Sequence, residues 1–84
     1  MERRYGRFYI TFDLLEDDPE TIMKRIMPNF VILKAEAIYS KRYIEYQAYS
    51  PLFRELPIWD DIPFYILFFG KDGELNVTEH EGEI

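Results

Sequence analysis

The sequence predicts a single small α+β domain in which one helix packs on a mostly antiparallel sheet of four to five strands. Three observations predict this two-layer fold. The chain has 84 residues, a length that supports one hydrophobic core and no second domain. Apolar residues make up 48% and charged residues 31%, a mix typical of a compact fold. The hydrophobic spacing gives the order β-α-β-β-(loop)-β-β over residues 1–84.

The chain opens with a predicted strand, because residues 7–15 alternate apolar and polar side chains. The face toward the core would carry Phe8, Ile10, Phe12 and Leu14. A helix start follows, in which Asp18 can cap a helix that begins with Pro19. Asp17 is an alternative cap, with Glu20 three residues later completing a capping box.

The helix itself is predicted to be short, about 10 residues, and to need a sheet for support. Its buried stripe shows three- and four-residue spacing and consists of Ile22, Met23, Ile26 and Met27. Lys24 and Arg25 face water in this arrangement. Pro28 and Asn29 end the helix, because the residue before a proline resists helical dihedral angles.

Four further strands are predicted as two hairpins. Residues 30–39 and 43–49 form the first, joined by a turn at 40–42. Residues 64–69 are apolar on both faces and predict a central, well-covered strand. A glycine-containing turn leads from it to a returning strand at 74–78, which could lie at an open sheet edge. Residues 79–84 are expected to form a flexible acidic tail.

The composition excludes several classes of function. The chain has no cysteine, which rules out disulfide scaffolds, thiolate metal sites and cysteine nucleophiles, and favours a cytoplasmic location. The longest apolar run is far too short to cross a bilayer, so we expect no membrane partner. The net charge is −6, which disfavours direct contact with nucleic acid. Residues 55–84 carry eight acidic side chains and one basic one, so the negative charge is concentrated toward the C-terminus.

Candidate catalytic groups are scarce. His80 is the only imidazole, and we expect it to be solvated in the tail. The acidic pairs at 17–18 and 60–61 lack the alternating oxygen ligands of calcium loops. We therefore expect no enzymatic activity, no cofactor and no metal site. Arg3, Arg4 and Arg7 alternate with aromatic residues as in single-strand binding surfaces, but the net charge argues against that function.

The most distinctive segment is the connection at residues 50–63, which is long for a loop and contains three prolines. Trp is the residue type most enriched at binding hot spots, and a loop stiffened by Pro57 and Pro63 loses little entropy on docking. The candidate binding residues of this loop are Trp59, Ile58, Ile62, Asp60, Asp61 and Glu55. The alternative is that Trp59 folds back as a lid over the sheet edge.

Residues 43–63, a strand, the proline-rich loop and the start of an apolar strand, loosely resemble a pattern in small proteins encoded by bacteriophages. The resemblance covers about a quarter of the chain, names no family and assigns no site residue. It implies a short early protein that binds and redirects a host protein in the host cytoplasm.

Together these observations predict a non-enzymatic protein-binding module that inhibits or modulates a partner with a basic surface, such as a nucleic-acid-handling enzyme. Two alternatives stay open. The chain could self-associate through an edge strand, as a dimer or as part of an assembly. It could also mimic DNA with its carboxylates, although sixteen acids diluted by ten bases are few for that role.

Overall fold

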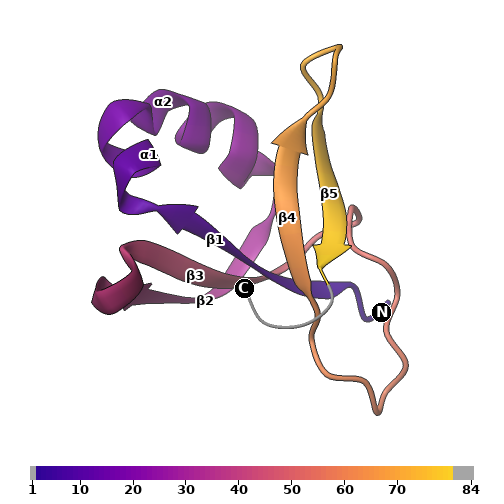
Figure 1. The fold of residues 1–84 in the computed structure, drawn as a ribbon. Coiled ribbons are helices and arrows are strands. Elements are labelled where there is room, and N and C mark those ends of the chain that lie inside the picture. Colours follow the sequence, from indigo (N-terminus) through magenta and orange to yellow (C-terminus); the bar gives the residue numbers. More distant parts are fainter. Residues whose placement is uncertain (1, 81–84) are drawn as a thin grey trace.

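The computed structural model describes residues 2–80, which form one five-stranded mixed sheet with a helical segment packed on one face (Figure 1). The strands are β1 (Tyr5–Thr11), β2 (Val31–Ile38), β3 (Tyr43–Tyr49), β4 (Phe64–Phe69) and β5 (Leu75–His80). The helical segments are α1 (Phe12–Asp17), α2 (Pro19–Thr21), the π-helical η1 (Ile22–Ile26) and the 3₁₀ turns η2 (Met27–Asn29) and η3 (Tyr39–Lys41). The predicted α+β class is confirmed.

The strand order is β2-β3-β1-β4-β5, so β1 lies in the middle of the sheet. β1 pairs with β3 and β3 with β2, both antiparallel and along nearly the whole strands, with a bulge in β2 between Ile32 and Lys34. β4 and β5 form the second antiparallel hairpin. β1 and β4 run parallel and pair at one position, Arg7 with Phe64. The sheet is therefore mixed, whereas the sequence alone gave no sign of the parallel contact.

The first strand ends earlier than the alternation predicts. β1 stops at Thr11, and Phe12 and Leu14 belong to α1 rather than to the strand. The Thr11 hydroxyl accepts a hydrogen bond from the Leu14 N–H at 3.2 Å and so caps α1. An alternating pattern that ends in a helix cap of this kind cannot be distinguished by periodicity from a longer strand.

The second helical piece begins as predicted. Asp18 caps α2, its carboxylate accepting hydrogen bonds from both the N–H and the hydroxyl of Thr21. Ile22 and Ile26 are buried against the sheet, but Met23, expected in the buried stripe, is 72% exposed. The helical path ends at Asn29, close to the predicted boundary.

The core lies between the helical segment, β1 and the two hairpins. Its buried members are Phe8, Ile10, Ile22, Ile26, Phe30, Ala48, Phe53 and Tyr65. Aromatic rings fill much of it: the ring centroids of Phe8 and Phe30 are 4.6 Å apart, and those of Phe53 and Tyr65 are 4.5 Å apart. Phe53 comes from the 50–63 loop, so this loop contributes directly to the core.

The predictions for the C-terminal hairpin were partly wrong. β4 does lie inside the sheet order, but it is not well covered, because the side chains of Ile66, Phe68 and Phe69 are exposed. β5 continues to His80, two residues beyond the predicted strand, and it occupies an edge of the sheet. The rest of the predicted tail, residues 81–84, lies outside the described residues.

Candidate functional site

The 50–63 loop begins at a buried serine. Ser50 is fully buried, and its hydroxyl donates to the Asn29 carbonyl at 2.8 Å and accepts from the Leu52 N–H at 3.2 Å. The Ser50 N–H donates to the Arg4 carbonyl at 3.1 Å. The polar groups of this buried side chain are thereby satisfied, which fixes the direction in which the loop leaves β3.

Two apolar side chains seat the first half of the loop. Phe53 is 1% exposed and stacks on Tyr65 of β4 and on Phe30, while Leu56 is also buried. The Leu56 N–H donates to the Arg3 carbonyl at 2.7 Å, which ties this half of the loop to the N-terminal segment.

Three arginines at the N-terminus hold the loop by its main chain. Arg4 donates to the Phe53 carbonyl at 2.8 Å. Arg3 donates to the Pro57 carbonyl at 2.8 Å. Arg7 donates through its side chain to the Ile62 carbonyl at 3.0 Å, and its guanidinium stacks on the Phe64 ring at 4.3 Å. The basic residues considered for nucleic acid are therefore engaged in bracing the loop.

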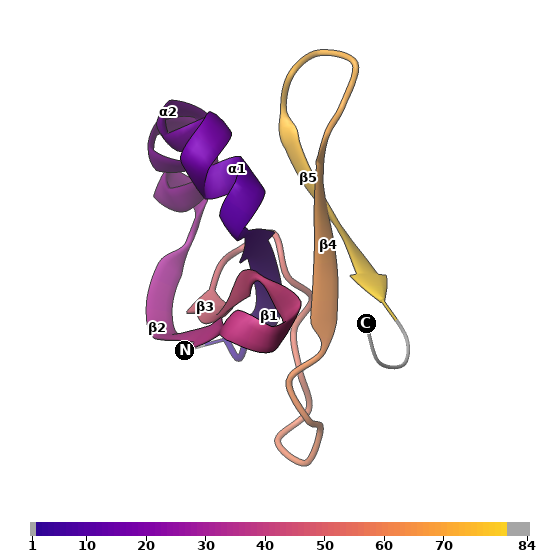
Figure 2. The same ribbon diagram turned by 60° about the vertical axis from the view of Figure 1, so that its left-hand side comes forward.

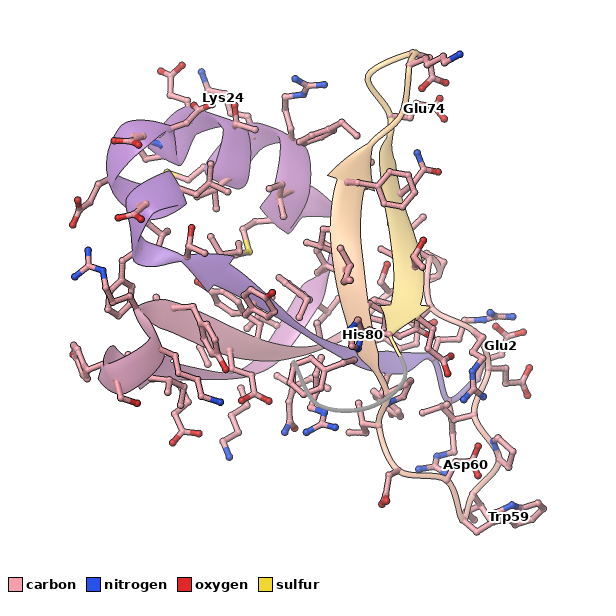
Figure 3. The ribbon with its side chains drawn as sticks, in the orientation of Figure 1. Glu2, Lys24, Trp59, Asp60, Glu74 and His80 are labelled. Atoms are coloured by element: carbon pink, nitrogen blue, oxygen red, sulfur yellow. The ribbon has the colours of Figure 1, made fainter. Side chains whose placement is uncertain are left out.

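The loop tip projects away from the fold. The Asp60 N–H donates to the Pro57 carbonyl at 3.1 Å, which closes a turn over residues 57–60. The two residues inside this turn, Ile58 and Trp59, are 78% and 81% exposed. Figure 3 shows Trp59 at the extremity of the molecule, with its indole pointing outward. The lid alternative is therefore wrong for Trp59.

The carboxylates of the loop have different surroundings. Asp60 is partly buried and lies 3.8 Å from Arg54, which also pairs with Glu79 of β5. The hydrogen bond to Glu79 raises the pKa of the Arg54 guanidinium above its usual value. Glu55 and Asp61 are exposed, and neither forms an ion pair within residues 2–80.

Ile62, the last of the predicted binding residues, is only partly exposed, and its carbonyl is held by Arg7. Of the six candidates, the structure therefore presents Ile58 and Trp59 together at the tip. Glu55 and Asp61 are exposed and form no ion pair within residues 2–80, although the charge of Glu55 acts on Arg4. Asp60 and Ile62 serve mainly to fix the loop.

The acidic residues between positions 55 and 80, the part of the C-terminal third that the structure describes, do not form one surface. Glu74, which follows the β4–β5 turn, and Asp60, at the loop tip, lie at opposite ends of the molecule (Figure 3). Within these residues, concentration of charge along the sequence therefore does not become a single acidic patch.

The structure also bears on the histidine, the potential metal ligands and the possible membrane segments considered in the sequence analysis. His80 belongs to β5 rather than to a loose tail; it is partly buried, and its buried Nδ1 atom has no hydrogen-bond partner among residues 2–80. No cluster of three or more potential metal ligands occurs in residues 2–80. Among the described helices, none combines the length and apolar character needed to cross a membrane.

Sequence reasoning missed the residues that shape the site. Phe53 and Leu56 read as ordinary loop residues, and the three arginines lie in a distant part of the chain. One local feature could have indicated the packing of this loop: two large apolar side chains in a proline-bounded loop favour a segment that packs against the core rather than one that extends into solvent. The pairing of the arginines with loop carbonyls has no sequence signature.

Comparisons of this chain with protein-family models, with curated proteins and with solved structures find no match. The resemblance of residues 43–63 to small phage proteins therefore stays a prediction.

Proposed function

We propose that this protein is a non-enzymatic protein-binding module whose anchor is the Ile58–Trp59 tip. The observation that carries the proposal is an indole that is 81% exposed at the end of a loop whose main-chain carbonyls accept hydrogen bonds from three arginine side chains. Exposing a large apolar side chain has no benefit for folding. It is useful when the side chain enters a pocket on a partner.

The bracing supports this proposal energetically. A loop that is already fixed by Arg3, Arg4 and Arg7 loses little conformational entropy when it docks. More of the burial energy of the tip then becomes affinity. The same bracing also explains why the indole stays exposed instead of collapsing onto the sheet.

The finer part of the proposal concerns the partner. Glu55 and Asp61 are exposed carboxylates of the loop that form no ion pair with the described residues, so a partner with basic side chains around an apolar pocket is favoured. A phage-type inhibitor or modulator that docks on a nucleic-acid-handling host enzyme would meet such a surface. This part rests on charge and on the resemblance to phage proteins.

The test compares wild type with Trp59→Ala in affinity capture from a host lysate, followed by titration of the captured partner. Truncation of a hot-spot residue costs about 2 kcal/mol or more, so we expect affinity to fall at least about thirtyfold. Tyr39→Ala is the matched control, because Tyr39 is an equally exposed aromatic residue, at 79%, in η3. Equal losses for both variants, or no loss for Trp59→Ala with an intact fold, would refute the anchor.

The charge part has its own test. Asp61→Asn should lower the association rate and its salt dependence, because it removes an exposed carboxylate beside the tip. Asp72→Asn is the control, since Asp72 is an exposed acid of the β4–β5 turn and its asparagine can still accept the Glu74 N–H. Identical rates for the two variants would show that the loop carboxylates do not steer association.

Self-association is the second candidate function, favoured by the position of β5 at a sheet edge. Sedimentation at several protein concentrations tests it directly.

DNA mimicry has less support, because the acidic side chains divide between two ends of the fold; competition with duplex DNA for the captured partner would distinguish it from ordinary docking.

A further inference from the structure

An apolar groove of about 410 Å³ separates β4 from β1 and the helical segment. Its walls, as far as residues 2–80 form them, hold apolar side chains and tyrosines and no charged side chain. Leu14 of α1 and Ile26 of η1 close the helical side. Figure 2 shows the β4–β5 hairpin standing apart from α1 and from the end of β1 at this place. The groove is separate from the 50–63 loop, none of whose residues lines it.

β4 turns its edge toward this groove. Five consecutive residues, 65–69, line it. Successive side chains of a strand point to opposite faces, so a cavity above one face would be lined by alternate residues. The unbroken run therefore places the main chain of β4 along the wall.

The pairing with β1 decides which main-chain groups of β4 point into the groove. The Arg7 N–H donates to the Pro63 carbonyl at 2.9 Å across the parallel pair. Main-chain groups alternate in direction along a strand, so those of residues 65, 67 and 69 also point toward β1. Those of residues 64, 66 and 68 point toward β5. The N–H and C=O groups of Leu67 and Phe69 therefore face the groove.

The same argument applies to β1. The main-chain groups of its even-numbered residues point toward β3. Two hydrogen bonds just beyond the ends of the strand show this direction: the Arg4 carbonyl accepts from the Ser50 N–H, and the Phe12 N–H donates to the Arg42 carbonyl. Tyr9 follows Arg7 on the opposite edge, toward β4. The ladder between β1 and β4 consists of the single pair Arg7–Phe64 and includes neither Tyr9 of β1 nor Leu67 of β4. The groove thus lies between two strand edges whose main-chain groups have no ladder partner in the described fold.

These groups constrain what the groove can hold. A hydrocarbon chain or another purely apolar molecule would remove them from water and leave them without hydrogen bonds, which is costly. An extended peptide offers matching N–H and C=O groups and can also place side chains on the apolar walls. We propose that the groove is a second binding site, which accepts an extended peptide as an added strand with apolar residues at alternate positions and basic residues beside them.

The basic residues follow from the charge on the α1 side of the groove; the cation at the groove, Arg25, lies over the Phe69 ring and donates to the Gly73 carbonyl. Leu14 lies on α1, which also carries Asp13, Glu16 and Asp17. Asp13 pairs with Arg42 at 3.3 Å, whereas Glu16 and Asp17 are exposed and form no ion pair in the part of the chain that the structure describes. A lysine or arginine of the peptide next to α1 would complement these carboxylates.

The experiment uses the full chain and a short capped synthetic peptide that alternates valine and lysine, with amide hydrogen exchange measured by NMR. In the free protein, the amides of Tyr9, Leu67 and Phe69 should exchange fast and those of Ile66 and Phe68 slowly. The peptide should slow exchange at the first three and leave the other two unchanged. Fast exchange that the peptide does not slow would overturn the proposal.

Two peptide controls test main-chain recognition. The same peptide is methylated at every second main-chain nitrogen, in each of the two possible patterns, which keeps the side chains and removes half of the donors. At least one pattern should bind about tenfold or more weakly. If both methylated peptides bind as tightly as the unmodified peptide, or if decanoate displaces the peptide, the groove recognises apolar surface alone and the proposal is contradicted.

Variants of the protein locate the site. Leu14→Lys should weaken peptide binding about tenfold, because it places a charge on the apolar wall and repels the lysines of the peptide. Met23→Lys is the matched control on the same helical segment, since Met23 is exposed and does not line the groove. Trp59→Ala should leave peptide binding unchanged, which separates this site from the proposed tip. An unchanged affinity in Leu14→Lys, or protection of the three amides by raising the protein concentration without peptide, would show a different site or a second copy as occupant and overturn the proposal.

Discussion

The two sides of β1 are held by different kinds of interaction. On one side, β3 and β2 continue the sheet through antiparallel ladders along nearly whole strands. On the other side, the β4–β5 hairpin shares a single parallel pair with β1 and is otherwise held by side chains. Tyr65 stacks on Phe53, and Arg25 lies over the Phe69 ring at 4.5 Å and donates to the Gly73 carbonyl at 2.7 Å.

This difference has a consequence for local stability. Opening the β2–β3–β1 side requires a ladder of main-chain hydrogen bonds to break together. Opening the hairpin side requires aromatic packing and a few polar contacts to separate. We therefore expect the hairpin to be the less stable region, and the apolar groove to exist because a ladder does not close it.

The largest expected effect comes from Phe53→Ala. Phe53 is 1% exposed and connects Phe30 on one side of the core with Tyr65 on the other. Truncation should lower the free energy of unfolding by about 3–5 kcal/mol, measured by denaturant unfolding. Hydrogen exchange should accelerate first in β4 and β5. Leu52→Ala, at an exposed neighbour, is the control; uniform acceleration over all five strands would argue that the two sides open as one unit.

A smaller loss is expected for Gly6→Ala. Gly6 is buried in β1, and an added Cβ would lie 2.8 Å from ring carbons of both Phe53 and Tyr65. Displacing these rings should lower the free energy of unfolding by about 1–3 kcal/mol. At Gly70 an added Cβ would lie close to the ends of two surface side chains, Asn76 and Asp72, and at ordinary contact distance, 3.8 Å, from the Glu74 carbonyl, so Gly70→Ala should cost less in the same measurement. A Gly6→Ala protein as stable as Gly70→Ala would show that the hairpin packs loosely on β1.

The smallest effect concerns acid stability on the helical side. The hydrogen bond from the Thr21 hydroxyl, helped by the Thr21 N–H, lowers the pKa of the Asp18 carboxyl below its ordinary value. The ionised cap therefore stabilises the fold above the ordinary aspartate pKa, and this contribution is lost as the pH falls through the lowered pKa. Asp18→Asn keeps an acceptor but removes the titrating group.

The readout for Asp18→Asn is hydrogen exchange of the Thr21 amide across the acidic range. Wild type should lose protection there with falling pH, and the variant should show a flatter profile. The β4–β5 amides should respond equally in both proteins. A variant whose Thr21 profile matches wild type would mean that the cap contributes nothing through its charge.

Local patterns predicted much of the fold. The Asp18–Pro19 helix start and both hairpins follow from capping chemistry and turns that neighbouring residues determine. The end of β1 could not be predicted, because Phe12 and Leu14 satisfy both strand alternation and the first turn of α1. The central place of β1 depends on pairing between distant segments, which no local window records.

For the candidate site, the sequence singled out residues of the loop tip, whereas the contacts that hold the loop in place were not predicted. Trp59 and Ile58 stood out because of their chemistry and their proline-bounded loop, and they do lie together at the tip. Whether the indole faced inward or outward depended on Phe53 and on the arginines of the N-terminus. Those contacts join segments far apart in sequence, and no local pattern indicates them.

The way in which the arginines hold the loop has a consequence for how its sequence can change. Arg3, Arg4 and Arg7 donate to carbonyl oxygens, which every amino acid supplies, and these hydrogen bonds do not involve the side chains at positions 58, 59 and 61. New side chains at these three positions, with Asp60 and its ion pair with Arg54 kept, should therefore have the same support. The side chains exposed at the loop tip can therefore change, by evolution or by library selection, while the contacts that hold the loop stay the same.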